Sequence, residues 1–168
     1  NQKTLASTRS VTDLFFEHGV ACNPKVNKDK FAGIARVKEY FAADKIRDEK
    51  RPLKILNLFG YTGCATLACM QAGASVCHVD ASKGMVQWAK ENSVSSNISD
   101  KPVRWLVDDC VKFVQREIRR GNKYDGIIMD PPSYGRGPGG EIWKLEEQLY
   151  PLVMLCKQVL SDNPVFFI

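Results

Sequence analysis

The sequence predicts an α/β fold in which helices cover both faces of a doubly wound, mainly parallel sheet. Short apolar runs of strand character alternate with helix-length segments five times along the chain. The first of these strands breaks into a glycine turn that opens a helix, and an acidic residue ends the second strand. In sheets of this kind, ligands bind outside the carboxyl ends of the strands.

The composition is that of an ordinary globular chain, with 168 residues, 44% hydrophobic and 26% charged. The net charge of +5 is concentrated in residues 1–51, which hold 11 Lys and Arg against 7 Asp and Glu. We expect two parts: a basic segment over 1–51, with a helix over 31–46 that packs on the core, and the core itself over 52–168. No apolar run approaches the roughly 20 residues that span a bilayer, and no cysteine or histidine spacing suggests a metal. We therefore expect a cytoplasmic protein without membrane or metal partners.

The stretch Lys54–Gly63 (KILNLFGYTG) predicts a strand followed by a loop with glycines at Gly60 and Gly63. The helix that follows is expected over Cys64–Gln71. A glycine turn between strand and helix leaves amide N–H groups unpaired, and we expect these groups to point into a ligand crevice. Taken alone, the two glycines are equally consistent with an ordinary tight turn.

The second strand is expected over Ser75–Asp80, and a helix over about 83–92 follows it. Asp80 stands twenty residues after Gly60, where a carboxylate can accept hydrogen bonds from both hydroxyls of a ribose. The alternative is that Asp80 caps the next helix, although Ser82 can do so instead. The distance to the glycine loop favours ribose binding.

The third strand, Val103–Val107, ends in Asp108, Asp109 and Cys110, and a helix to about Arg120 follows. One of the two aspartates is expected to cap this helix. The other is placed to reach the amino group of an adenine.

The fourth strand, Tyr124–Met129, runs directly into Asp130, Pro131, Pro132, Ser133 and Tyr134. Two prolines stiffen the chain here, so the Asp130 carboxylate and the nearby carbonyls are held facing outward. Rigid acceptors suit an amino or imino group of a planar base, on which Tyr134 can stack. A proline-stopped strand followed by a plain loop is the alternative.

The remaining chain contains a glycine-rich stretch, Gly135–Gly140, that we interpret as a flexible lid or substrate loop around Arg136. A long helix is expected over about 141–160, and Trp143 either joins the core or borders the site. Pro164–Ile168 begins a fifth strand. Its exposed edge predicts association with a partner or poor solubility.

Together, NLFGYTG, HVDAS, VDDC and DPPSYGRGPGGEIWKLEE resemble the motifs of class I S-adenosylmethionine-dependent methyltransferases, most closely those that modify cytosine or guanine of bacterial large-subunit ribosomal RNA. The resemblance covers about 53–168. It implies a Rossmann-like sheet, S-adenosylmethionine as cofactor and RNA, ribosomal RNA above all, as substrate. It implies catalytic roles for Asp130, Pro131, Pro132 and Tyr134. The implied cofactor-binding residues are Asn57, Phe59, Gly60, Tyr61, Thr62, Gly63, Asp80, Ala81, Ser82, Asp108, Asp109, Cys110 and Asp130.

Two departures from that family stand out. Its sheet normally gains two more strands after the fifth, for which this sequence has no residues, and neither Cys110 nor Cys156 matches the nucleophilic cysteine of the carbon-methylating members. The acceptor atom therefore stays open, with a slight preference for nitrogen. A cofactor-binding module without complete activity and a small-molecule methyltransferase remain alternatives. A nicotinamide dehydrogenase is disfavoured because Tyr61 and Thr62 break the GxGxxG pattern.

Overall fold

A computed structural model describes residues 51–168 of the chain. The expected helix over 31–46 and most of the basic segment lie outside the described residues. The first five described elements are β1 (Lys54–Leu58), α3 (Cys64–Gln71), β2 (Ser75–Asp80), α4 (Lys83–Ser95) and β3 (Val103–Val107). The others are α5 (Cys110–Arg120), β4 (Gly126–Met129), β5 (Tyr134–Arg136), β6 (Ile142–Lys144), α6 (Leu145–Val159) and β7 (Phe166–Phe167).

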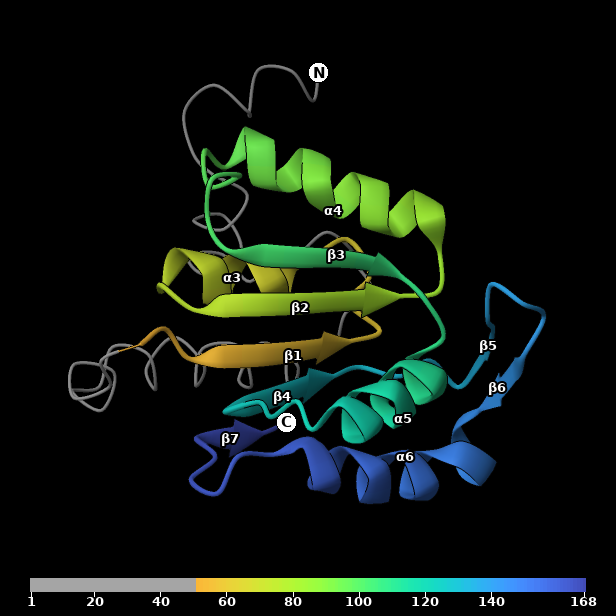
Figure 1. Ribbon diagram of the computed structural model, residues 1–168. Helices are drawn as coiled ribbons and strands as arrows, with labels where there is room; N and C mark the ends of the chain where they lie inside the picture. The colour runs from red at the N-terminus through yellow and green to blue at the C-terminus, as the bar shows by residue number, and fades with distance from the viewer. Residues whose placement is uncertain (1–50) are drawn as a thin grey trace.

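The main sheet has five parallel strands in the order β3-β2-β1-β4-β7. At its centre, Ile55 of β1 lies opposite Val76 of β2 and Gly126 of β4. Because the strands are parallel, their carboxyl ends share one edge, on the right of Figure 1, beside the β5–β6 hairpin. This order confirms the predicted doubly wound α/β fold.

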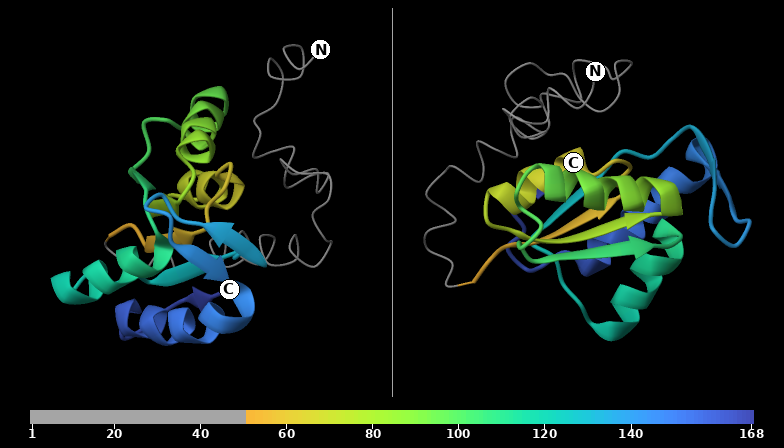
Figure 2. Two further views of the ribbon diagram at one scale, coloured as in Figure 1. Left: turned by 90° about the vertical axis from the view of Figure 1, so that its right-hand side faces the viewer. Right: turned by 90° about the horizontal axis from the view of Figure 1, so that it is seen from above.

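The two faces of the sheet bury separate cores, because successive strand residues point to opposite sides. Leu56 and Leu58 face α5 and α6, where they pack with Phe113 and Leu152. Ile55 belongs to the other core, which includes residues of α3. Figure 2 shows α3 and α4 on one side of the sheet and α5 and α6 on the other. Both faces are therefore covered, as the apolar strands require.

The chain between β4 and α6 differs from the expectation. Residues 134–144 form a two-stranded antiparallel hairpin, not a flexible lid that leads into a helix at about 141, and α6 begins at Leu145. Trp143 explains the difference: it is buried between the exposed Ile142 and Lys144, an alternation that suits a strand. The Leu145 N–H then donates to the Ser133 carbonyl at 3.0 Å. This bond ties the end of the hairpin to its beginning.

No helix within residues 51–168 combines the length and the apolar character needed to cross a membrane. In the same part of the chain, no three His, Cys, Asp or Glu side chains gather in a way that could hold a metal ion.

Candidate functional site

A cavity of about 470 Å³ opens at the carboxyl edge of the sheet, under the β5–β6 hairpin. Each of the loops after β1, β2, β3 and β4 contributes to its wall, as the sequence predicted. The lining residues are Phe59, Tyr61, Asp80, Ala81, Ser82, Met85, Asp109, Cys110, Val111, Asp130, Pro131, Pro132, Gly135, Arg136, Gly137 and Trp143. The volume lies within the usual range for small-molecule sites.

The glycine loop after β1 has an unusual backbone. Phe59 and Tyr61 both adopt left-handed conformations, with φ of 53° and 50°, although neither is glycine. A Cβ on Gly60 would lie 2.3 Å from the ring of His78, so no side chain fits there without movement. Strained conformations of this kind persist only where the surroundings hold them, and they cluster at functional sites.

The loop amides do not point unpaired into the cavity, contrary to the expectation from the sequence. The N–H of Phe59 contacts Cys110 Sγ at 3.4 Å, and the N–H of Gly60 donates to the Val79 carbonyl at 3.0 Å. The Tyr61 N–H donates to Asp80 Oδ2 at 2.8 Å. These bonds fix the strained loop to its neighbours. The three N–H groups already have acceptors and so do not point unpaired into the cavity.

A buried polar group lies behind the loop, between β1, β2 and α3. Thr66 Oγ1 accepts from Asn57 Nδ2 at 2.8 Å and lies 2.9 Å from His78 Nδ1. Burial lowers the pKa of His78 to about 4, so its ring is neutral near pH 7. Asn57 therefore supports the loop from behind and does not line the cavity. The same holds for three other candidate residues of the loop: Gly60, Thr62 and Gly63.

Asp80 holds the turn after β2 and faces the cavity. Its Oδ1 accepts the Ser82 N–H at 2.8 Å while its Oδ2 accepts the Tyr61 N–H. Ser82, not Asp80, caps α4, through a bond from the Met85 N–H of 3.4 Å. A carboxylate has about four lone-pair positions. Asp80 thus keeps acceptor capacity for a ligand beyond its two backbone bonds.

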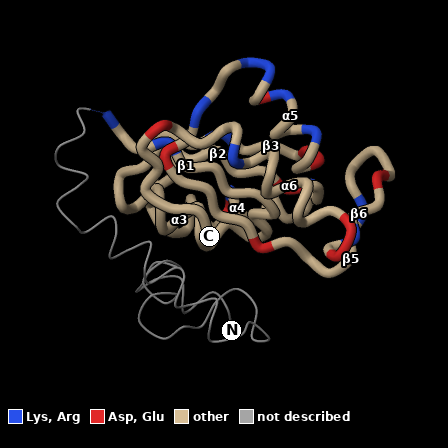
Figure 3. Tube along the Cα trace, turned by 90° about the horizontal axis from the view of Figure 1, so that it is seen from below, with Lys and Arg blue, Asp and Glu red and all other residues tan. Residues whose placement is uncertain are grey.

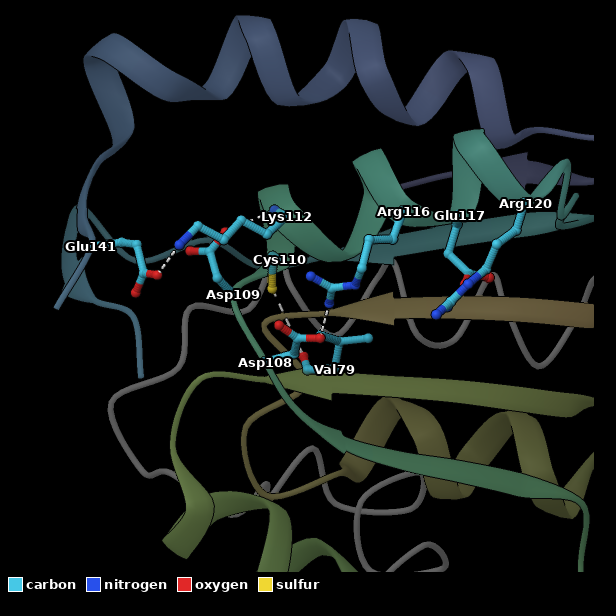
Figure 4. Close-up of polar contacts among 9 residues, drawn as sticks. All are labelled: Val79, Asp108, Asp109, Cys110, Lys112, Arg116, Glu117, Arg120 and Glu141. Atoms are coloured by element: carbon cyan, nitrogen blue, oxygen red, sulfur yellow. Dashed lines mark hydrogen bonds and ion pairs between the residues drawn. The ribbon is translucent and has the colours of Figure 1, made fainter. Parts of the chain in front are cut away.

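The two aspartates after β3 have different surroundings. Asp109 caps α5, accepting the Lys112 N–H through Oδ1 at 2.8 Å, and it also lines the cavity. Asp108 lies outside the cavity and forms an ion pair with Arg116 (Figure 4). One residue, Asp109, therefore occupies both the capping and the cavity positions that the sequence divided between two.

Lys112 also connects α5 to the hairpin. Its ammonium group forms an ion pair with Glu141, as Figure 4 shows. The second carboxylate oxygen of Glu141 accepts the Gly139 N–H at 2.8 Å. This contact fastens the tip of the hairpin next to the cavity mouth.

The acceptor segment Asp130–Pro132 lines the cavity on the side of β4. Trp143 holds it from behind, since its Nε1–H donates to the Pro132 carbonyl at 2.7 Å. The same indole packs against Phe59, with ring centroids 4.8 Å apart. Trp143 thus contacts both the acceptor segment and the glycine loop, and it belongs to the core and to the site at once. Tyr134 does not line the cavity.

Cys110 is the cysteine that lines the cavity, and its thiol is unsuited to nucleophilic attack. Burial raises its pKa well above the ordinary value. Only 3% of the residue is exposed, and its sulfur is held between the Phe59 N–H and the Val79 carbonyl. The groups available to a ligand in this apolar cavity are therefore carboxylates and carbonyls, which accept hydrogen bonds.

Two lining residues, Met85 and Val111, were not predicted from the sequence. They lie in the first turns of α4 and α5, directly after the two acidic strand ends. An apolar residue at that position was the signal in the sequence that could have indicated a cavity wall. Gly135, Arg136 and Gly137 belong to the stretch that the sequence predicted as a lid or substrate loop. They line the cavity as part of a hairpin, whose short strands gave little signal in the sequence.

No protein-family model matches the chain. The chain is 38% identical over 112 residues to the ribosomal RNA large subunit methyltransferase K/L of Shewanella oneidensis, which covers 66% of this chain and 15% of that protein. It is 33% identical over 120 residues to the protein of that name from Pseudoalteromonas translucida, and this match covers 70% of this chain and 17% of that protein. The chain thus spans less than a fifth of the length of these curated relatives.

Solved structures of methyltransferases share the fold of this chain. A SAM-dependent methyltransferase from Agrobacterium tumefaciens superposes with a TM-score of 0.74 at 44% identity, over 82% of this chain and 43% of that one. One from Thiobacillus denitrificans, in complex with S-adenosyl-L-homocysteine, superposes with a TM-score of 0.55 at 16% identity, over 89% and 50%.

Proposed function

We propose that this chain, whose fold is that of the S-adenosylmethionine-dependent methyltransferases, transfers a methyl group from S-adenosylmethionine to a base of RNA. One observation carries the proposal: acidic residues from three successive strand ends, Asp80, Asp109 and Asp130, line a single cavity. The similarity of the chain to ribosomal RNA large subunit methyltransferases supports RNA as the substrate, with ribosomal RNA as the first candidate.

The residues of the cavity fit the nucleoside part of the cofactor. We assign Asp80 to the two ribose hydroxyls, because its carboxylate retains lone pairs on the cavity side. Asp109 is placed to accept from the adenine amino group, and Met85 and Val111 supply apolar walls for a planar ring. When bound, S-adenosylmethionine supplies an activated methyl group on a sulfonium.

The acceptor base is assigned to the Asp130–Pro132 side of the cavity. Asp130 and the Pro131 carbonyl are placed to accept hydrogen bonds from a base, whereas the Pro132 carbonyl is already used by Trp143. Such acceptors orient a nitrogen that carries hydrogen, and no thiol with an ordinary pKa lines the described cavity to attack a ring carbon. We therefore propose nitrogen as the acceptor atom. The protein's part is to align that atom and exclude water.

Other expectations stay predictions. A ribosomal RNA substrate supports a cytoplasmic location, and the basic segment over 1–51 is proposed as a part separate from the core. The exposed edge of β7 is proposed to associate with a partner, because unpaired edges invite association.

The test is a transfer assay with methyl-labelled S-adenosylmethionine and total bacterial RNA, in which the RNA is afterwards digested to nucleosides and separated. We expect label in one methylated base, and none with Asp130→Ala. Asp100→Ala, at an exposed turn between α4 and β3, is the matched control and should keep full transfer. Label in small molecules but never in RNA would replace this proposal with a small-molecule methyltransferase.

A further inference from the structure

The β5–β6 hairpin has two different faces. Gly135 pairs with Trp143, and both lie on the side that lines the cavity. Because neighbouring strand residues point to opposite faces, the flanking pairs start from the other side of the hairpin, although Arg136 also lines the cavity. These pairs are Tyr134 with Lys144 and Arg136 with Ile142. We call these four residues the outer hairpin face.

The outer hairpin face is exposed and begins at the cavity mouth. The exposed fractions of Tyr134 and Ile142 are 55% and 50%. Tyr134 follows the acceptor segment in the chain with one residue between them, and Arg136 also borders the cavity. A strand of nucleic acid whose base entered the cavity would therefore pass along this face.

The charge of this face suits phosphate. Arg136 forms no ion pair within the part of the chain that the structure describes. Lys144 pairs with Glu147 at 2.8 Å, but both groups are more than half exposed, and such pairs contribute little. The hairpin's own acid, Glu141, is held by Lys112 (Figure 4). Figure 3 shows basic positions on the hairpin, with acidic positions next to them.

We infer that the outer hairpin face binds the single-stranded RNA next to the methyl-accepting base. Tyr134 stacks on a neighbouring base, and Arg136 and Lys144 contact the flanking phosphates. This inference rests on the proposed function and gives Tyr134 a place outside the cavity. Stacking tolerates any base, and a target base withdrawn from its stack leaves its neighbours free for such contact.

The test measures affinity for fluorescein-labelled oligouridylate by anisotropy at several salt concentrations. Tyr134→Ala should weaken binding about tenfold, while Tyr134→Phe retains it, because the ring and not the hydroxyl stacks. Arg136→Gln should reduce the slope of log affinity against log salt by about 0.7. Tyr150→Ala is the matched control, since Tyr150 is 74% exposed on α6 and lies outside the hairpin.

Each variant is also titrated with S-adenosylhomocysteine, which shows that the cavity is intact. Equal oligouridylate affinity in wild type and Tyr134→Ala would overturn the inference and leave the proposed function standing. A wild-type chain that binds S-adenosylhomocysteine but no oligouridylate would overturn both the inference and the RNA part of the proposed function.

Discussion

The indole N–H of Trp143 donates to the carbonyl of Pro132 at 2.7 Å, and the same ring lies against Phe59 of the glycine loop. One side chain thus joins the two halves of the cavity. The bond engages the Pro132 carbonyl on the side of the cavity that Asp130 and Pro131 also line.

Replacing Trp143 with Phe keeps an aromatic ring near Phe59 but removes the N–H. The Pro132 carbonyl then loses its partner, so we expect a loss of about 1–3 kcal/mol in the free energy of unfolding. We also expect methyl transfer to fall more than the affinity for S-adenosylhomocysteine, because the bond positions the acceptor segment. Denaturant unfolding measures the stability, the transfer assay measures methyl transfer, and calorimetry measures the affinity for S-adenosylhomocysteine. A variant that loses cofactor affinity but transfers normally when saturated would contradict this role.

Replacing Gly60 with Ala places a Cβ 2.3 Å from the His78 ring. Because this ring is buried and bonded to Thr66, we expect the loop to shift, with a loss of about 1–3 kcal/mol in stability and a clear loss of cofactor affinity. Gly84→Ala is the control: its Cβ would meet nothing nearer than 3.9 Å, and alanine favours the helix by up to about 1 kcal/mol. Equal effects of the two substitutions would show that the contact with His78 is unimportant.

The pH dependence of stability should reveal His78. Its pKa is about 4 in the folded chain, against about 6.5 when unfolded, so between these values only the unfolded state binds the proton. Stability is therefore complete above about pH 6.5 and falls as the pH drops toward 4. Urea unfolding at pH 7 and pH 5 should show this loss in wild type and a smaller one in His78→Gln. His18→Gln tests the other histidine of the sequence. An unchanged pH dependence in His78→Gln would contradict the assignment.

Methyl transfer should not require the Cys110 thiol. Since burial raises its pKa, the thiol stays protonated near neutral pH. We expect the Cys110→Ala variant to retain methyl transfer once it is saturated with cofactor. We also expect native Cys110 to resist alkylation by iodoacetamide, which mass spectrometry of peptides measures. A covalent complex between chain and RNA that disappears in Cys110→Ala would instead establish carbon methylation.

The sequence predicted the sheet and several elements to the residue, because their signals are local. Cys64–Gln71, Ser75–Asp80 and Val103–Val107 each stand between clear turn or capping residues. The hairpin was missed because strands of three residues are set by pairing across the turn and by the burial of Trp143. Neither appears in a linear pattern.

The candidate site was predicted by position more than by contact. That Asp80, Asp109 and Asp130 face one cavity follows from parallel strands sharing an edge. That Asp109 rather than Asp108 faces it depends on the turn into α5, where Arg116 holds Asp108 aside. The use of the loop amides by Asp80 and Cys110 is likewise a tertiary arrangement that the sequence does not reveal.

The central claim is that the cavity beside Asp80 binds S-adenosylmethionine. Calorimetric titration with S-adenosylhomocysteine, with NAD as control, tests it most directly. We predict micromolar binding of S-adenosylhomocysteine and none of NAD, with Asp80→Ala weakening the former by about 1–3 kcal/mol because the ribose loses its acceptor. Binding of NAD in preference, or an affinity for S-adenosylhomocysteine that Asp80→Ala leaves unchanged, would contradict the account.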